Sequence, residues 1–142
     1  MAYSPLMVQP MRDEVTRLGV QELRTVDDVD TFLGSGDDPS LLFVNSVCGC
    51  AAGNARPALM LALEAADCPP KRATVFAGQD PESTARVRDM FADIPASSPC
   101  FYVIKNDRVV GHVPRAGIEG HTAEAVAFQL RSIFKDLNND AT

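Results

Sequence analysis

Two cysteines separated by a single glycine, Cys48-Gly49-Cys50, are the residues of this sequence best suited to chemistry. They follow an apolar run, residues 41–47, that has the length of a buried strand, and they precede a segment rich in Ala, Leu and Met, which favour helix. A thiol at the entrance of a helix is acidified, because unpaired amide groups and the helix dipole stabilise its thiolate. We therefore expect Cys48 to be a nucleophile, Cys50 to resolve a mixed disulfide formed on it, and Gly49 to give the turn its backbone freedom.

The spacing of the two cysteines also bears on the disulfide that they would form. A bridge across one intervening residue closes a tight ring and departs from the preferred geometry of disulfides, which makes it easier to reduce. The spacing therefore favours a pair that resolves or rearranges disulfides over a strong general reductant.

Two other interpretations of these thiols are open at the level of sequence. Cysteines at the end of a strand often pack as small hydrophobic residues. The same pair could also carry a metal ion, an iron–sulfur cluster or sulfur, although structural zinc takes four ligands and clusters take several thiolates. The other candidate ligands form no second paired motif: Cys68, Cys100, His112 and His121. We therefore favour thiol–disulfide chemistry and predict no metal site; Cys68 is expected to be structural, and Cys100 either to lie near the thiols or to pack inertly.

Composition narrows the classes of protein that the chain can belong to. The 142 residues include 13 Lys and Arg against 19 Asp and Glu, a formal net charge of −6, and the basic residues are scattered, which argues against nucleic acid as a partner. No apolar run approaches the roughly 18 residues needed to span a membrane, and the N-terminal residues lack the basic and apolar regions of a signal peptide. We expect a cytoplasmic protein without a membrane partner, folded as a single domain over residues 1–142.

The order of apolar patterns predicts an α/β fold with a central mixed sheet flanked by helices. Helices are expected at residues 7–18, Val26–Leu33, 50–66, from residue 80 to about 94, and 126–137; strands are expected at 21–25, 41–47, 74–77, 101–105 and Arg108–Val113. The first helix is either continuous or broken at Pro10, and Pro57 is expected to kink the third helix at Gly53. Asn106-Asp107 suits a two-residue hairpin that makes the last two strands antiparallel neighbours.

Four segments of the sequence resemble a known family. They are residues 45–57 (NSVCGCAAGNARP), 75–80 (VFAGQD), 97–99 (SSP) and 114–121 (PRAGIEGH), and the similarity extends over nearly the whole chain. The family is the bacilliredoxins, which are thioredoxin-like. The resemblance implies a thioredoxin-like fold and the removal of the small thiol bacillithiol from mixed disulfides on client proteins, with disulfide isomerase activity as a further option. Bacillithiol is then the thiol substrate, no cofactor is bound, and a reductase recycles the protein.

The resemblance also implies roles for individual residues. Cys48 would take the bacillithiol and Cys50 would resolve it. Pro99 would follow a cis peptide bond and face the two thiols, with Ser98 flanking the reactive sulfur, although X–Pro bonds in general are mostly trans. Arg115 is a candidate partner for the carboxylates of bacillithiol. Independently of the resemblance, Arg56 could assist an anionic substrate thiol from the helix that follows the cysteines, although an exposed helix arginine is the more frequent case.

Overall fold

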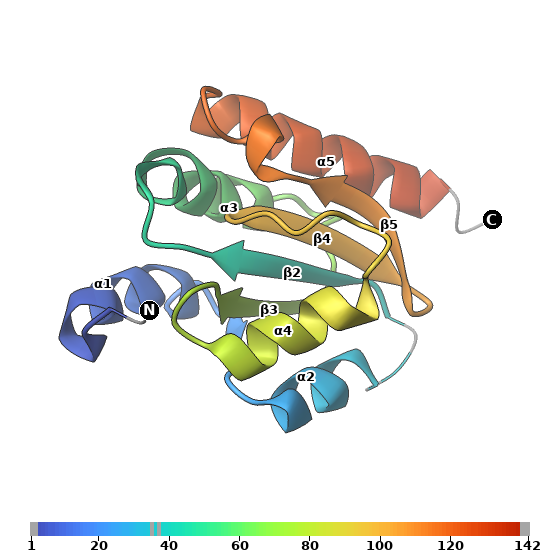
Figure 1. The fold of residues 1–142 in the computed structure, drawn as a ribbon. Coiled ribbons are helices and arrows are strands. Elements are labelled where there is room, and N and C mark those ends of the chain that lie inside the picture. The colour runs from blue at the N-terminus through green and yellow to red at the C-terminus, as the bar shows by residue number, and fades with distance from the viewer. Residues whose placement is uncertain (1–2, 35, 37, 140–142) are drawn as a thin grey trace.

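The apolar runs of the sequence form a five-stranded mixed sheet in the order β1-β3-β2-β4-β5 (Figure 1). The computed structural model describes residues 3–34, 36 and 38–139, so the two ends of the expected domain, 1–2 and 140–142, lie outside the described part. The strands are β1 (Gln21–Glu22), β2 (Ser40–Asn45), β3 (Lys71–Phe76), β4 (Cys100–Lys105) and β5 (Arg108–Val113). β3 runs parallel to both β1 and β2, and β4 runs antiparallel to both β2 and β5.

Helices cover both faces of this sheet, as Figure 1 shows. They are α1 (Pro5–Thr16), α2 (Val26–Leu33), a π-helical turn η1 (Ala51–Ala55), α3 (Arg56–Leu63), α4 (Pro81–Met90), a 3-10 turn η2 (Arg115–Gly117) and α5 (Ala123–Asn139). Alternate residues of β2 point to opposite faces: Leu41 and Phe43 pack in the cluster that includes α3 and α5 residues, whereas Leu42 and Val44 pack with α2 and α4. Every residue of β2 is buried, as expected for a strand covered on both sides.

The predicted mixed sheet between helices is therefore confirmed, and so is the hairpin. Asn106 and Asp107 have φ angles of 53° and 63°, the left-handed conformation that a tight two-residue turn requires, and Lys105 pairs with Arg108 across it. α1 runs through Pro10 without a break. Pro10 is exposed, so the carbonyl that it leaves without an amide partner can bind water.

Several predicted boundaries were wrong. The strand expected at 21–25 ends at Glu22, because Thr25 instead caps α2 in a capping box with Asp28. β3 begins at Lys71 rather than Thr74, since its first residues pair with the start of β2 although they are only half-buried. β2 ends at Asn45, two residues before the predicted end, and the last helix begins at Ala123.

The segment after the cysteines differs from the single kinked helix that the sequence predicts. The irregularity is a π-helical turn, Ala51–Ala55, in which the amide of Arg56 donates to the carbonyl of Ala51. Pro57 falls in the first turn of α3, where a residue without an amide hydrogen is tolerated. The irregularity expected before Pro57 is thus a wide turn that contains Gly53.

A buried ion cluster joins α1 to the sheet. The guanidinium of Arg12 donates to both carboxylate oxygens of Asp80, at 2.7 and 2.9 Å, and to Glu22 at 3.1 Å, and it lies over the ring of Phe76. Arg12 and Asp80 are 6% and 7% exposed, so each buried charge relies on the other to compensate for its lost hydration. α1 is thereby fixed beside the ends of β1 and β3.

In the described part of the chain, no helix has both the length and the apolar character needed to cross a membrane.

Removing Arg12 should destabilise the fold strongly, because Asp80 would keep a buried charge without its partner. We expect Arg12→Ala to lower the free energy of unfolding by about 3–5 kcal/mol in urea denaturation. Arg24→Ala is the matched control: Arg24 also pairs with Glu22, but it is 51% exposed, and its loss should cost less than about 1 kcal/mol. Equal losses in the two variants would contradict this account of the cluster.

Candidate functional site

Cys48 and Cys50 lie where β2 ends and the next helical segment begins. Asn45 is the last residue of β2, and the carbonyl of Cys48 accepts the amides of Ala51 and Ala52 at 3.1 and 3.3 Å, so Cys48 stands at the helix entrance, as predicted. The two sulfurs are 2.7 Å apart, and both residues are half-buried free thiols. The structure thus brings together the pair that the sequence singles out.

The surroundings of the two sulfurs give the two thiols different pKa values. Burial opposes the thiolate of Cys48, but hydrogen bonds from the Cys50 thiol, the Ser46 hydroxyl and the amides of Ala51 and Cys50 together outweigh it and hold the pKa of Cys48 below its ordinary value. Burial and the neighbouring Cys48 thiolate raise the pKa of Cys50. The pair is therefore arranged to carry one negative charge, on Cys48, with the remaining proton on Cys50.

A buried hydrogen-bond network holds the turn that carries Cys48. The side-chain oxygen of Asn45 accepts the amide of Ser46 at 2.9 Å and a guanidinium N–H of Arg56 at 3.0 Å. Arg56 also donates to the carbonyl of Ser46 at 3.0 Å and to the carboxylate of Glu14 in α1. The Ser46 hydroxyl in turn accepts the amide of Cys48 at 3.1 Å.

This network corrects the expectation for Arg56 and adds residues that the sequence reasoning missed. Arg56 is 5% exposed and is committed to Asn45, Ser46 and Glu14, so it is neither an ordinary exposed arginine nor free to bind an anionic thiol. It holds the residues that precede Cys48 in place. The polar pair Asn45-Ser46 at the end of an apolar strand was the one available signal, whereas nothing local pointed to Glu14.

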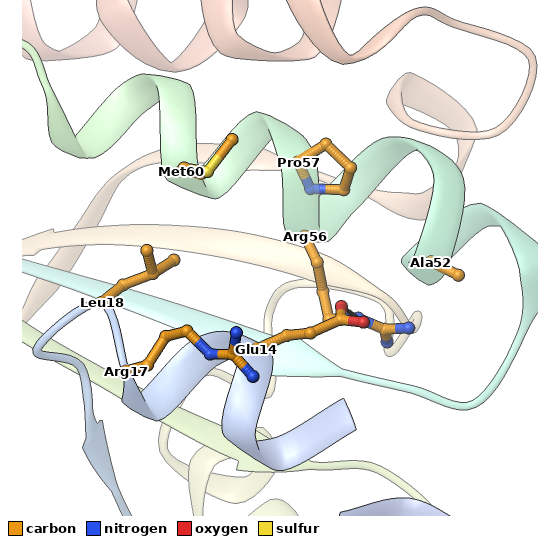
Figure 2. Close-up of a pocket in the computed structure, with 7 residues that line it drawn as sticks. All are labelled: Glu14, Arg17, Leu18, Ala52, Arg56, Pro57 and Met60. Carbon is orange, nitrogen blue, oxygen red and sulfur yellow. Dashed lines mark hydrogen bonds and ion pairs between the residues drawn. The ribbon is translucent and has the colours of Figure 1, made fainter. Parts of the chain in front are cut away.

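An open cavity lies beside this network, between α1 and the helix that follows the thiols (Figure 2), and its volume is about 320 Å³. Its wall is formed by Glu14, Arg17, Leu18, Ala52, Arg56, Pro57 and Met60. Glu14 and Arg56 meet within it, and their opposite charges offset one another. Ala52 is two residues beyond Cys50, so the cavity adjoins the thiol turn from the side of α1.

The segment before β4 lies at the same edge of the sheet. The bond between Ser98 and Pro99 is cis, which confirms that expectation. Val44 of β2 pairs with Cys100 of β4, so Pro99, one residue before Cys100, lies beside the end of β2 from which the thiol turn continues. Residues 98–99 and the thiol turn are therefore neighbours.

Arg115 in η2 joins this segment to the thiols. Its amide donates to the hydroxyl of Ser97 at 3.3 Å, and its guanidinium donates to the carbonyl of Ser98 at 3.5 Å and pairs with Glu119 at 3.0 Å. The hydrogen bond to Glu119 and the charges of Cys50, Glu119 and Cys48 raise the pKa of Arg115. The predicted residue Arg115 thus lies close enough to both sulfurs for its charge to act on them.

Known proteins resemble this chain in sequence over most of its length and in fold. A family model described as disulphide isomerase matches residues 3–137. A bacilliredoxin of Salinibacter ruber is 50% identical over 137 residues, covering 95% of this chain and 81% of the relative, and a bacilliredoxin of Geobacillus kaustophilus is 46% identical over 138 residues, covering 94% and 95%. The chain belongs to the bacilliredoxin family.

The solved structure of thioredoxin from Trypanosoma brucei brucei has the same fold, with a TM-score of 0.56, 20% identity and coverage of 85% of this chain and 92% of that one. The resemblance stated from the sequence and the predicted thioredoxin-like fold are confirmed. As a bacilliredoxin of thioredoxin fold, the protein is a thiol–disulfide oxidoreductase.

The remaining cysteines of this bacilliredoxin are packed away from solvent. Cys68 is buried against the core on the α3 and α5 side, and burial raises its pKa, in agreement with the structural role expected for it. Cys100 lies near the thiol edge of the sheet, but it is fully buried, and burial raises its pKa to about 11. Of the two expectations for Cys100, inert packing therefore fits the structure. Among the described residues, no group of three or more His, Cys, Asp and Glu side chains is placed to hold a metal ion.

Cys48 should be the most reactive of the four thiols. Alkylation requires the thiolate, and a lowered pKa means that the thiolate forms at a lower pH, so the rate at Cys48 should reach half its maximum below the pH at which free cysteine does. Cys50, Cys68 and Cys100, with raised pKa values, should react later and more slowly. Iodoacetamide labelling over a pH series, with each peptide quantified by mass spectrometry, measures this order. Fastest labelling at Cys68 or Cys100 would contradict it.

Ser46→Ala should make Cys48 less acidic, because the hydroxyl hydrogen bond to its thiolate is lost. Since a hydrogen bond contributes about 1 kcal/mol, we expect the midpoint of the Cys48 alkylation profile to rise by about 0.7 pH units. Ser40→Ala is the control, since Ser40 is also buried but lies at the opposite end of β2. An unchanged midpoint in Ser46→Ala would show that this hydroxyl does not act on the sulfur.

Proposed function

We propose that this bacilliredoxin removes bacillithiol from protein mixed disulfides and that Cys48 and Cys50 are its catalytic residues. The observation that carries the proposal is the unequal pair of thiols: Cys48 has a lowered pKa and Cys50 a raised one, with 2.7 Å between the sulfurs. A lowered pKa supplies a nucleophile near neutral pH, and the proximity supplies a second thiol that can resolve the product.

The reaction has two exchange steps. The Cys48 thiolate attacks the bacillithiol sulfur of the mixed disulfide; a bond forms between these sulfurs, the original S–S bond breaks, and the client leaves as a thiolate that takes a proton from solvent. Cys50 then loses its proton and attacks the Cys48 sulfur, which releases bacillithiol as a thiolate. The Cys48–Cys50 disulfide that results holds the two-electron oxidation that the mixed disulfide carried. A reductase must return two electrons and two protons to restore the dithiol.

The residues around the pair are proposed to shape this site. Gly49 allows the short turn between the sulfurs, and Arg56 holds that turn through Asn45 and Ser46. Ser98 and Pro99 border the thiols from the β4 side, where a client chain would lie. Arg115 is proposed to bind a carboxylate of bacillithiol, because its exposed guanidinium acts on both sulfurs.

The partners implied are bacillithiolated client proteins, bacillithiol itself and a recycling reductase, in the reducing environment of the cytoplasm. The thiols carry the electrons themselves, so the proposed reaction needs no bound cofactor. Disulfide isomerase activity is a second proposal, supported by the family description and by a nucleophile that can attack a protein disulfide by the same exchange reaction.

Single-cysteine variants test the assignment. With a bacillithiolated reporter protein, Cys48→Ala should release no bacillithiol above the level without enzyme, because the attacking sulfur is gone. Cys50→Ala should free the reporter once and then accumulate as a bacillithiol adduct on Cys48, visible by intact-mass spectrometry. Cys68→Ala is the control and should turn over normally. If instead Cys48→Ala freed the reporter once and accumulated a bacillithiol adduct on Cys50, while Cys50→Ala were inert, the two roles would be reversed.

The wild-type protein distinguishes this chemistry from carriage of a metal ion or cluster by the same thiols. Thiol titration of the wild type with and without a chelator should give equal counts for an oxidoreductase. A higher count after chelation would favour the carrier hypothesis.

A further inference from the structure

The pair of Arg115 and Glu119 stands out because it is exposed, charged and beside the reactive sulfurs. Nε of Arg115 is 3.0 Å from the carboxylate of Glu119, one helical turn further along the chain. The backbone of Arg115 is anchored by its amide on Ser97, and its guanidinium donates to the carbonyl of Ser98. Glu119 thus takes up an edge of a guanidinium whose position beside the site is otherwise fixed by the segment before β4.

We propose that Glu119 is a specificity-determining residue: it occupies Arg115 as an exchangeable substitute for the carboxylate of an anionic thiol substrate. The inference rests on the proposed function and extends it. It names negatively charged small thiols as the preferred class of substrate, and Glu119 as the residue that competes with them for Arg115 and so weakens the preference.

The geometry supports an exchange because neither side chain is committed to its partner. Arg115 and Glu119 are 45% and 60% exposed, and ion pairs this exposed contribute little to stability. The guanidinium has five N–H donors, whereas its contacts with described residues use only Nε and one terminal nitrogen. The other terminal nitrogen lies on the same edge as Nε, so a substrate carboxylate that displaced Glu119 from Nε could bind both nitrogens in the two-bond arrangement that guanidinium groups favour.

The effects of Arg115 and Glu119 on the acidity of Cys50 also support the proposal. The charge of Arg115 lowers the pKa of Cys50 and that of Glu119 raises it, after the larger effects of burial and of Cys48. Both side chains therefore act at the place where the small thiol is bound and released. An anionic substrate meets attraction from Arg115 and repulsion from Glu119, whereas a neutral substrate meets neither.

The first test avoids turnover and uses Cys48 itself. Iodoacetate and iodoacetamide alkylate the same sulfur but differ in one negative charge, so the ratio of their rates measures selection for anions at the site. We expect Glu119→Gln to raise this ratio about three- to tenfold and Arg115→Gln to lower it by a similar factor; a change in the acidity of Cys48 affects both reagents alike and cancels in the ratio. Asp136→Asn is the charge-matched control: Asp136 lies towards the far end of α5, and its variant should keep the wild-type ratio.

The double variant separates competition for Arg115 from a general effect of charge. If Glu119 acts by occupying Arg115, Glu119→Gln should have almost no effect on the ratio when Arg115 is already Gln. An equal rise of the ratio with and without Arg115 would overturn the proposal, since long-range repulsion would then account for the result. An unchanged ratio in Glu119→Gln would overturn it as well.

The second test uses turnover. One reporter protein is converted to mixed disulfides with mercaptosuccinate, which is anionic, and 2-mercaptoethanol, which is neutral. Glu119→Gln should raise kcat/KM three- to tenfold for the first only, and this gain should shrink as salt is added. Equal gains for both thiols would contradict the proposal. If the wild type released no bacillithiol from the bacillithiolated reporter while the alkylation ratios changed as expected, the proposed function would fail and anion selection by this pair would stand.

Discussion

The buried guanidinium of Arg56 is the constraint on which the site depends. A charge withdrawn from water needs partners on every side, and Arg56 finds them in the side chain of Asn45, the carbonyl of Ser46 and the carboxylate of Glu14. These contacts tie the end of β2 to α1 and to the helix that follows the thiols. The turn between β2 and η1 therefore has little freedom, and the amide and side chain of Ser46 are held where Cys48 needs them.

That rigidity explains how two chemically identical thiols two residues apart differ in acidity. Cys48 receives hydrogen bonds from Ser46 and from the first amides of the helix, whereas Cys50 receives mainly the effects of burial and of its neighbour. The difference comes from the positions of donors that the fold has already fixed, so no charged side chain has to contact Cys48 directly. Arg115 and Glu119 are then left for the role proposed for them toward the substrate.

The features that could be predicted from the sequence are those whose causes are local. The two-residue turn at Asn106-Asp107 and the entry of the helix at Cys48 depend on neighbouring residues, and both were predicted with the order of the strands and helices. The cis bond before Pro99 and the position of Arg115 near the thiols followed from the family resemblance. The predicted length of β1 was wrong because it left out a local competitor of the strand, the capping box of Thr25 and Asp28 that begins α2.

The features that escaped prediction depend on residues far apart in the chain. Glu14 and Arg56 are separated by 42 positions, and no periodicity or motif links them, so the burial of Arg56 could not be anticipated. The same holds for Arg12 and Asp80, separated by 68 positions. Hydrophobic patterns indicate which faces turn inward, but they do not indicate which charged groups meet once those faces are packed.

The burial of Cys68 and Cys100 has a practical consequence for studying the molecule. Both side chains are buried, and burial raises the pKa of each thiol, that of Cys100 to about 11. A thiol-directed fluorophore or spin label applied near neutral pH is therefore directed to the Cys48-Gly49-Cys50 turn of the unmodified chain. The native sequence can serve as its own reporter of oxidation state, without the engineered cysteine-free background that such labelling usually requires.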